Sequence, residues 1–174
     1  MQTIINQIPQ DYWNGKQTIE IGYPWITPGA MIMLEQIIKP DFKILEIGCG
    51  GSTVFYSKFC STIYSLESSA VWAEHVKTKT SASIKVLENT EKTLAFINLL
   101  NNNYFDLISV DGARIISRLA VTKAVIPKVK TWLLLDNYDA NGSENFKAPE
   151  KWKCYTFDDM HWQGKGTKIL QRTV

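Results

Sequence analysis

The stretch from Ile44 to Ser57, ILEIGCGGSTVFYS, decides which fold the rest of the chain can form. A short apolar run ends in three closely spaced glycines, and a helical pattern follows from Ser52 or Thr53 onward. Glycine lets the backbone turn tightly, and the free amides at the start of a helix can approach and bind a ligand. The stretch therefore predicts a strand, a ligand-binding turn and a helix.

Acidic residues around this turn indicate a positively charged ligand rather than a phosphorylated one. In the dinucleotide-binding pattern GxGxxG, counted from Gly48, the third glycine would stand where this chain has Thr53. Glu46 lies two residues before Gly48, where its charge would repel a pyrophosphate and suit an ammonium or a sulfonium. The alternative is a plain glycine-rich turn in which Glu46 pairs with a surface lysine.

A second acidic residue stands at the position where a ribose is bound in nucleotide-binding folds. Glu67 ends the next apolar run, and an acid about 20 residues beyond the glycine turn can accept hydrogen bonds from both ribose hydroxyls. S-adenosyl-L-methionine combines a ribose with an ammonium and a sulfonium. It is the cofactor that Glu46 and Glu67 together predict.

The rest of the chain alternates short apolar runs with amphipathic segments. The predicted strands are 43–47, 63–66, 84–87, 105–110, 132–135, 153–157 and 167–171, and the predicted helices are 28–38, 69–79, 90–100 and 114–126. A polar loop, 138–149, precedes the last two strands, which are expected to form an antiparallel edge. This pattern predicts an α/β fold with a single Rossmann-like, doubly wound sheet, mostly parallel, with an antiparallel strand near the C-terminal edge.

Length and composition favour a single globular domain. A chain of 174 residues is expected to form a single domain, 1–174, with 1–27 as an N-terminal segment that could act as a lid and 28–174 as the core. The net charge of +2 without a basic run argues against an obligatory nucleic-acid partner. No apolar run approaches the roughly 18 residues that cross a bilayer, and the N-terminal stretch lacks a signal pattern, so a cytoplasmic location without membrane attachment is expected. The three scattered cysteines are expected to be reduced thiols.

Four motifs together resemble the class I S-adenosylmethionine-dependent methyltransferases: LEIGCGGST, SLE ending at Glu67, FDLISVDG and WLLLDN. The resemblance spans about residues 25–171, with Ser52 in place of a glycine that the family often has there. It implies the strand order 3-2-1-4-5-7-6 with an antiparallel seventh strand. The cofactor contacts expected from the turn and from this resemblance are Glu46, Gly48, Cys49, Gly50, Ser52, Thr53 and Glu67, with Asp111 at the methionine part and Glu88 and Asn89 near the adenine.

Polar residues also follow two later strands of the predicted sheet. Asp111 ends one strand and Asp136 with Asn137 ends the next, so their oxygens should share one rim, as candidates for aligning or deprotonating a methyl acceptor. Such oxygens suit Mg²⁺ or another divalent cation, and the set resembles that of cation-dependent catechol-type O-methyltransferases. In those enzymes a lysine follows the first aspartate by three residues, where this chain has Arg114, a poor base. Two alternatives are that the aspartates cap turns, or that Asp111 contacts the cofactor or substrate without a metal.

The leading functional hypothesis is methyl transfer to an oxygen or nitrogen of a small-molecule acceptor. The sequence DNYD replaces the NPPY-type motif of amide methylation, so methylation of a base is disfavoured. The acceptor would be recognised by the N-terminal segment, the loop 138–149 and the final hairpin, and the chain could form a homodimer to complete its pocket. The alternatives are a nicotinamide-dependent oxidoreductase and a non-catalytic module that binds the cofactor.

Overall fold

The computed structural model describes residues 18–112, 116–140, 143–158 and 166–173. The strands are β1 (Lys43–Ile47), β2 (Thr62–Glu67), β3 (Ser83–Val86), β4 (Phe105–Val110), β5 (Val129–Asp136), β6 (Trp152–Phe157) and β7 (Thr167–Arg172). The α-helices are α1 (Thr18–Ile21), α2 (Pro28–Ile37), α3 (Gly51–Ser57), α4 (Ala70–Lys77), α5 (Thr90–Leu99) and α6 (Arg118–Val125), and the 3₁₀ helices are η3 (Ile126–Lys128) and η4 (Ser143–Asn145).

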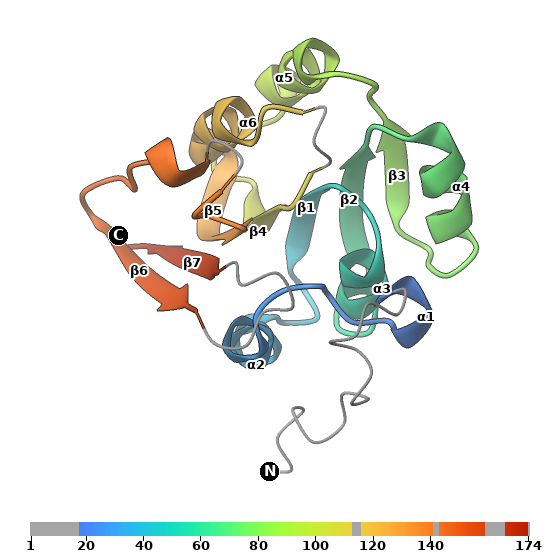
Figure 1. Ribbon diagram of the computed structural model, residues 1–174, viewed down its shortest axis with the longest axis horizontal. Helices are drawn as coiled ribbons and strands as arrows, with labels where there is room; N and C mark the ends of the chain where they lie inside the picture. Colours follow the sequence, from blue (N-terminus) through green and yellow to red (C-terminus); the bar gives the residue numbers. More distant parts are fainter. Residues whose placement is uncertain (1–17, 113–115, 141–142, 159–165, 174) are drawn as a thin grey trace.

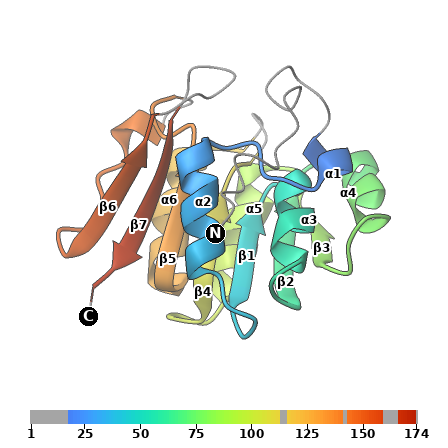
Figure 2. The ribbon, with the colours of Figure 1, turned by 90° about the horizontal axis from the view of Figure 1, so that it is seen from below.

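All described strands belong to one sheet in the order β3-β2-β1-β4-β5-β7-β6. The neighbours from β3 to β5 pair in parallel, whereas β7 is antiparallel to both β5 and β6 (Figure 2). This confirms the predicted α/β fold with a mostly parallel sheet and an antiparallel strand near the C-terminal edge. The polar side chains that end β1, β2, β4 and β5 consequently meet at one edge of the sheet.

Helices cover both faces of the sheet, with α5 and α6 on one side and α2 and α3 on the other (Figure 1). Each face has its own apolar core: Leu107 of β4 packs with the α2 side, and its neighbour Ile108 packs with the α6 side. Every residue of β4 is buried. The apolar run FDLISV shows no alternation because both faces of this central strand are covered.

Helix α1 lies over the start of α3, at the edge where the parallel strands end (Figure 2). A Cβ atom on Gly51 would lie 2.2 Å from the carbonyl oxygen of Tyr23 and 2.6 Å from that of Thr18. Only glycine leaves room for this approach, since Cβ atoms essentially never come that close to a backbone oxygen. The third glycine of the turn therefore holds part of the N-terminal segment against the sheet edge.

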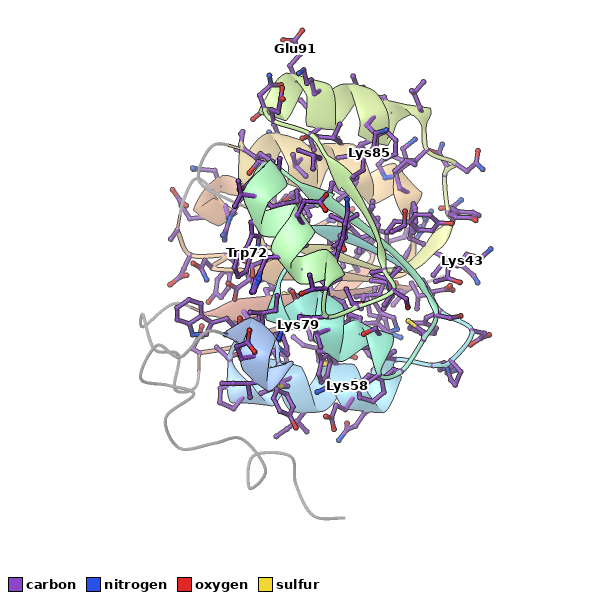
Figure 3. The ribbon with its side chains drawn as sticks, turned by 90° about the vertical axis from the view of Figure 1, so that its right-hand side faces the viewer. Lys43, Lys58, Trp72, Lys79, Lys85 and Glu91 are labelled. Atoms are coloured by element: carbon purple, nitrogen blue, oxygen red, sulfur yellow. The ribbon has the colours of Figure 1, made fainter. Side chains whose placement is uncertain are left out.

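Two lysines also bind α1 and the turn after it to the neighbouring helices. The Nζ of Lys58, from the end of α3, donates to the carbonyl of Gly22 at 2.7 Å. Lys79, which follows α4, reaches the carboxylate of Glu20 at 3.0 Å, and Figure 3 shows it beside α1. The described part of the predicted lid is thus attached on two sides.

Some predicted boundaries are wrong by a few residues. The helix after the glycine turn begins at Gly51, with Gly50 as its N-cap, rather than at Ser52 or Thr53. Helix α6 begins at Arg118 rather than at 114, because Ser117 forms the N-cap and its hydroxyl accepts from the amide of Ala120. Strand β5 starts at 129, earlier than predicted, because pairing with β4 continues beyond the apolar run. In the ranges that the structure describes, none of the helices has the length and apolar character needed to span a membrane.

Candidate active site

A cleft of about 160 Å³ opens at the C-terminal ends of β1 and β4. Its lining residues are Thr18, Trp25, Gly48, Cys49, Gly50, Gly51, Ser52, Trp72 and Asp111. The glycine turn forms one side, α1 and Trp25 lie above it, and Asp111 reaches it from the neighbouring strand. The structure therefore brings both sequence motifs, the glycine turn and the end of β4, into one cleft.

Gly48 allows these two motifs to meet. Its φ of +90° is a conformation that residues with a side chain rarely adopt, and its amide donates to the carbonyl of Leu66 at 2.8 Å. A Cβ atom here would lie 2.5 Å from the carbonyl oxygen of Asp111. Both the turn and the close approach of the β4 end require glycine at this position.

Glu46 is fully buried beneath the turn. Its carboxylate accepts hydrogen bonds from the hydroxyls of Ser52, Thr53 (2.6 Å) and Ser65 (2.7 Å). Burial raises the pKa of Glu46 to about 7, with a smaller contribution from the charge of Asp111, while the three hydroxyl bonds act in the opposite direction. In this arrangement Glu46 fixes the start of α3 from below, and its contact with a cofactor stays a prediction, as does that of Ser52 and Thr53.

Glu67 joins the end of β2 to the glycine turn. One of its oxygens accepts from the backbone amides of Ser68 and Ser69 at 2.7 and 2.8 Å, and the other accepts from the amide of Cys49 at 3.0 Å. A carboxylate oxygen can accept about two hydrogen bonds, so the oxygen bonded to the Cys49 amide can accept another one. The geometry is compatible with the predicted ribose contact, which remains a prediction.

The thiol of Cys49 lies at the same place in the turn. Burial, and then the charges of Glu67 and Glu46, raise its pKa far above the usual range. A thiol that stays protonated is neither a nucleophile nor a metal ligand. Cys49 therefore contributes its backbone amide and its small size.

Trp72 of α4 is a cleft residue that the sequence interpretation missed. Its indole nitrogen donates to the carbonyl of Cys49 at 2.6 Å, and its ring is 3.8 Å from the Cβ position of Gly50. Figure 3 labels Trp72 beside α4. On the other side is Trp25, one of the aromatic residues before α2 in the sequence. The sequence offered one signal, a tryptophan shortly after Glu67, but it fits the helical pattern of α4 and was interpreted as part of that helix.

Glu88 and Asn89, predicted to lie near the adenine, have other partners in the structure. Glu88 is exposed and pairs with Lys92, which lowers the pKa of its carboxyl. The side-chain oxygen of Asn89 accepts from the amide of Lys92 at 2.9 Å and so caps α5. Neither residue lines the cleft, and their contact with a cofactor stays a prediction.

Replacing Asn89 with alanine is expected to lower the free energy of unfolding by about 1 kcal/mol, because one amide of the first turn of α5 loses its acceptor. Asn89→Asp, which keeps the acceptor, should unfold at nearly the wild-type denaturant concentration. Urea unfolding followed by circular dichroism compares the three proteins. Equal midpoints for Asn89→Ala and the wild type would contradict the capping role.

Arg118 joins the ends of β4 and β5, and sequence reasoning missed it too. Its Nη2 donates to the Asp111 carboxylate at 3.1 Å, its Nη1 to the carbonyl of Asp136 at 2.9 Å, and its Nε to the carbonyl of Gly112 at 3.0 Å. Only 12% of its side chain is exposed. Asp111 keeps 29% of its side chain exposed, enough to contact a ligand in the cleft.

Asp136 and Asn137 lie beside Asp111 as predicted. The carboxyl of Asp136 accepts from the hydroxyl of Thr167 at 2.9 Å and from the side-chain amide of Asn137, and it lies within hydrogen-bonding reach of Asp111. Burial raises the pKa of both aspartates; the charge of Asp111 adds to this effect at Asp136, and Arg118 opposes it at both. Two neighbouring carboxyls of this kind share a proton more readily than they both ionise.

These residues do not fit a divalent cation. The guanidinium of Arg118 already occupies one side of Asp111, and both oxygens of Asp136 have donors from the chain. Asn137 directs its NH₂ group at Asp136 and thus acts as a donor there. Within the ranges 18–112, 116–140, 143–158 and 166–173, no cluster of three or more His, Cys, Asp or Glu side chains is placed to hold a metal ion. The predicted set is brought together, but as an ion-paired cluster.

Other polar residues lie away from the cleft or outside the described ranges. Arg114, which stands where the catechol-type enzymes have a lysine, and His161, one of the two histidines of the chain, fall outside the described residues. His75 is on the outer side of α4, with its ring nitrogen 3.8 Å from the carboxylate of Glu20. Of the late aromatic residues, Tyr155 and Phe157 pack against the core on the α2 side.

Comparison with known proteins bears on the fold. The chain is similar to the O-methyltransferase from Bacillus cereus, solved in complex with S-adenosylhomocysteine, with a TM-score of 0.69 and 14% identity over 98% of this chain and 95% of that chain. A structure from Streptococcus mutans described as a methyltransferase candidate, also with S-adenosylhomocysteine, has a TM-score of 0.49 and 10% identity over 91% and 99%, and at that score it supports no argument. No family model and no curated protein matches the chain.

At 14% identity, this likeness shows the fold alone. The chain shares the fold of this O-methyltransferase, and its strand order is the one that the four motifs implied. The predicted resemblance is confirmed at this level.

Proposed function

We propose that the chain is an S-adenosylmethionine-dependent methyltransferase that acts on an oxygen or nitrogen of a small-molecule acceptor. One observation carries the proposal: the glycine turn, the partly exposed carboxylate of Asp111 and two indole rings line a single cleft at the ends of β1 and β4. This is the edge at which open α/β sheets bind their ligands.

The charge around the cleft supports a cationic ligand. The carboxyls of Glu46, Glu67 and Asp111 gather around the turn, and Arg118 is paired with one of them. A pyrophosphate placed here would meet acidic groups, whereas a sulfonium or an ammonium would be attracted both to them and to the faces of Trp25 and Trp72. The balance favours the methionine part of S-adenosylmethionine over a nicotinamide dinucleotide.

Glu67, Gly48 and Gly50 would hold the cofactor, which supplies an activated methyl group when bound. The chain then has to align the acceptor and keep water away, since alignment provides much of the rate in such a transfer. Asp111 can accept a hydrogen bond from the acceptor's O–H or N–H and take its proton. Arg118 and Asp136 hold that carboxylate in place, and the two indoles shield the cleft.

The size of the cleft implies a movement. Its volume of about 160 Å³ is smaller than the roughly 300 Å³ of the smallest typical ligand pockets. Trp72 is held at the cleft by a hydrogen bond to the Cys49 carbonyl and by a ring contact with His75, with 5.4 Å between the ring centroids. We expect its ring to shift on binding, which would change the tryptophan fluorescence.

Isothermal titration with S-adenosylhomocysteine tests the proposal. The wild type should bind it, and Glu67→Gln should bind at least tenfold more weakly, because an amide replaces half of the acceptor capacity of the carboxylate. Glu74→Gln, which removes an exposed carboxyl on α4, is the matched control and should bind like the wild type.

Two outcomes would point to the alternatives. Quenching of tryptophan fluorescence by NADH, without a response to S-adenosylhomocysteine at millimolar concentration, would indicate an oxidoreductase. Binding of S-adenosylhomocysteine without methyl transfer to any of a panel of phenols, carboxylates and amines would indicate a binding module.

A further inference from the structure

The carboxylate oxygens at the ends of β4 and β5 could in principle bind a cation. The guanidinium of Arg118 already supplies a positive charge beside them. Arg118 contacts Asp111 through its Nη2 and the two strand ends through its other nitrogens, at 2.9 to 3.1 Å. The guanidinium is mostly buried. It cannot be deprotonated in a protein, so its positive charge is permanent.

The position of Arg118 in its helix is electrostatically unfavourable by itself. It is the first residue of α6, where the unsatisfied amides give the helix terminus a partial positive charge that disfavours a cation. The Asp111 carboxylate and the two carbonyls compensate for this. The stability of the helix therefore does not explain an arginine at this position, whereas the neighbouring aspartates do explain it.

The other two predicted ligands, Asp136 and Asn137, also form hydrogen bonds within the protein. Asp136 accepts from Thr167 and Asn137, and the hydroxyl of Thr167 in turn accepts from the amide of Thr27 at 3.1 Å. A hard cation takes six or more oxygen ligands, and even where water supplies most of them the protein's carboxylate oxygens must be turned toward it. To admit one here, the chain would have to release these donors and place the cation against a guanidinium.

We propose that Arg118 takes the place of the divalent cation predicted from Asp111, Asp136 and Asn137, and that it orients the Asp111 carboxylate so that the site works without a metal ion. This inference rests on the proposed function for its catalytic meaning. Arg118 is a positioning residue, since it acts on the acceptor through Asp111. The acceptor would then be bound by hydrogen bonds from its O–H or N–H groups rather than by chelation.

Binding of Mn²⁺, followed by electron paramagnetic resonance, tests the replacement directly. The wild type should show no site occupied at 1 mM Mn²⁺. Arg118→Met removes the charge with little change in size, and we expect it to bind Mn²⁺ at least tenfold more tightly than the wild type. Adding Asp111→Asn to this variant should abolish the gain. Arg118→Lys also loses the planar guanidinium but keeps the positive charge. It should therefore bind Mn²⁺ as weakly as the wild type does.

The variants separate charge from structure. The proposal that Arg118 takes the place of the cation is wrong if both Arg118→Met and Arg118→Lys gain Mn²⁺ binding, or if neither does. Micromolar Mn²⁺ binding by the wild type that Asp111→Asn removes would also overturn the proposal. Thermal melts confirm which variants are folded.

A second readout uses the wild type with ligand. The affinity for S-adenosylhomocysteine should be the same within twofold in EDTA and in 5 mM Mg²⁺, and a larger change would contradict the proposal. Failure to bind S-adenosylhomocysteine in either buffer would count against the proposed function alone, because the Mn²⁺ titration still decides the role of Arg118.

Discussion

Replacing Gly48 with alanine is expected to lower the free energy of unfolding by about 2 to 5 kcal/mol and to abolish binding of S-adenosylhomocysteine. A side chain at a φ of +90° costs about 1 to 3 kcal/mol. Displacing the Asp111 carbonyl, 2.5 Å from the new Cβ, costs about as much again. Both effects deform the turn and the end of β4, which form the cleft.

Gly50→Ala is the matched control for this prediction. The Cβ position at Gly50 lies 3.8 Å from the ring of Trp72, an ordinary contact distance, and its φ of 169° is extended backbone open to any residue. Chemical unfolding should therefore give a free energy for Gly50→Ala within about 1 kcal/mol of the wild type, because this glycine gains no clash. Equal stability of the two variants would mean that the close approach of β4 to the turn is wrong.

The stability of the chain is expected to fall by roughly 3 kcal/mol as the pH rises from about 4.5 to about 7. Burial raises the pKa of Glu46 from 4.5 to about 7. Between these values the folded chain binds more protons at Glu46 than the unfolded chain does, so raising the pH favours unfolding; above about 7 this contribution is constant. Burial raises the pKa of Asp111 and Asp136 as well, which adds to the fall in the same direction.

Glu46→Gln tests the source of this pH dependence. The amide is neutral at every pH and can still bond to the hydroxyls of Ser52, Thr53 and Ser65, so the fall in stability between pH 5 and 8 should become shallower by the part that Glu46 contributes. Glu74→Gln removes an exposed carboxyl and should leave it unchanged. Urea unfolding at pH 5, 6, 7 and 8 gives the free energy of unfolding of the three proteins. A free energy of the wild type that rises over this range would refute the effect assigned to the buried carboxyl.

Both predictions concern a turn whose conformation lowers the free energy of unfolding of the chain. A buried acid with a raised pKa and a glycine in the left-handed region are tolerated where the backbone must be fixed for a ligand. In this chain they lie within three residues of each other, at the end of β1.

The order of the residues was enough to predict the fold and the edge of the sheet that carries the site. Apolar runs of strand length alternating with helical ones can only be buried in a parallel sheet with helices on both faces, and the strand ends then meet at one edge. This is why the glycine turn, Glu67, Asp111 and Asp136 could be placed together without coordinates. Local patterns suffice for such predictions because they depend on hydrophobic periodicity and on backbone conformation.

The partners of each side chain were decided only by the tertiary structure. The sequence shows Glu46 as an acid before a glycine turn, but three hydroxyls from α3 and β2 surround it once the strands pair. Trp72 and Arg118 reach the site from helices whose rotation about their axes depends on packing. Charge pairing across elements depends on distances of a few ångströms, and it was this pairing, invisible in the order of residues, that placed a guanidinium where the sequence predicted a metal ion.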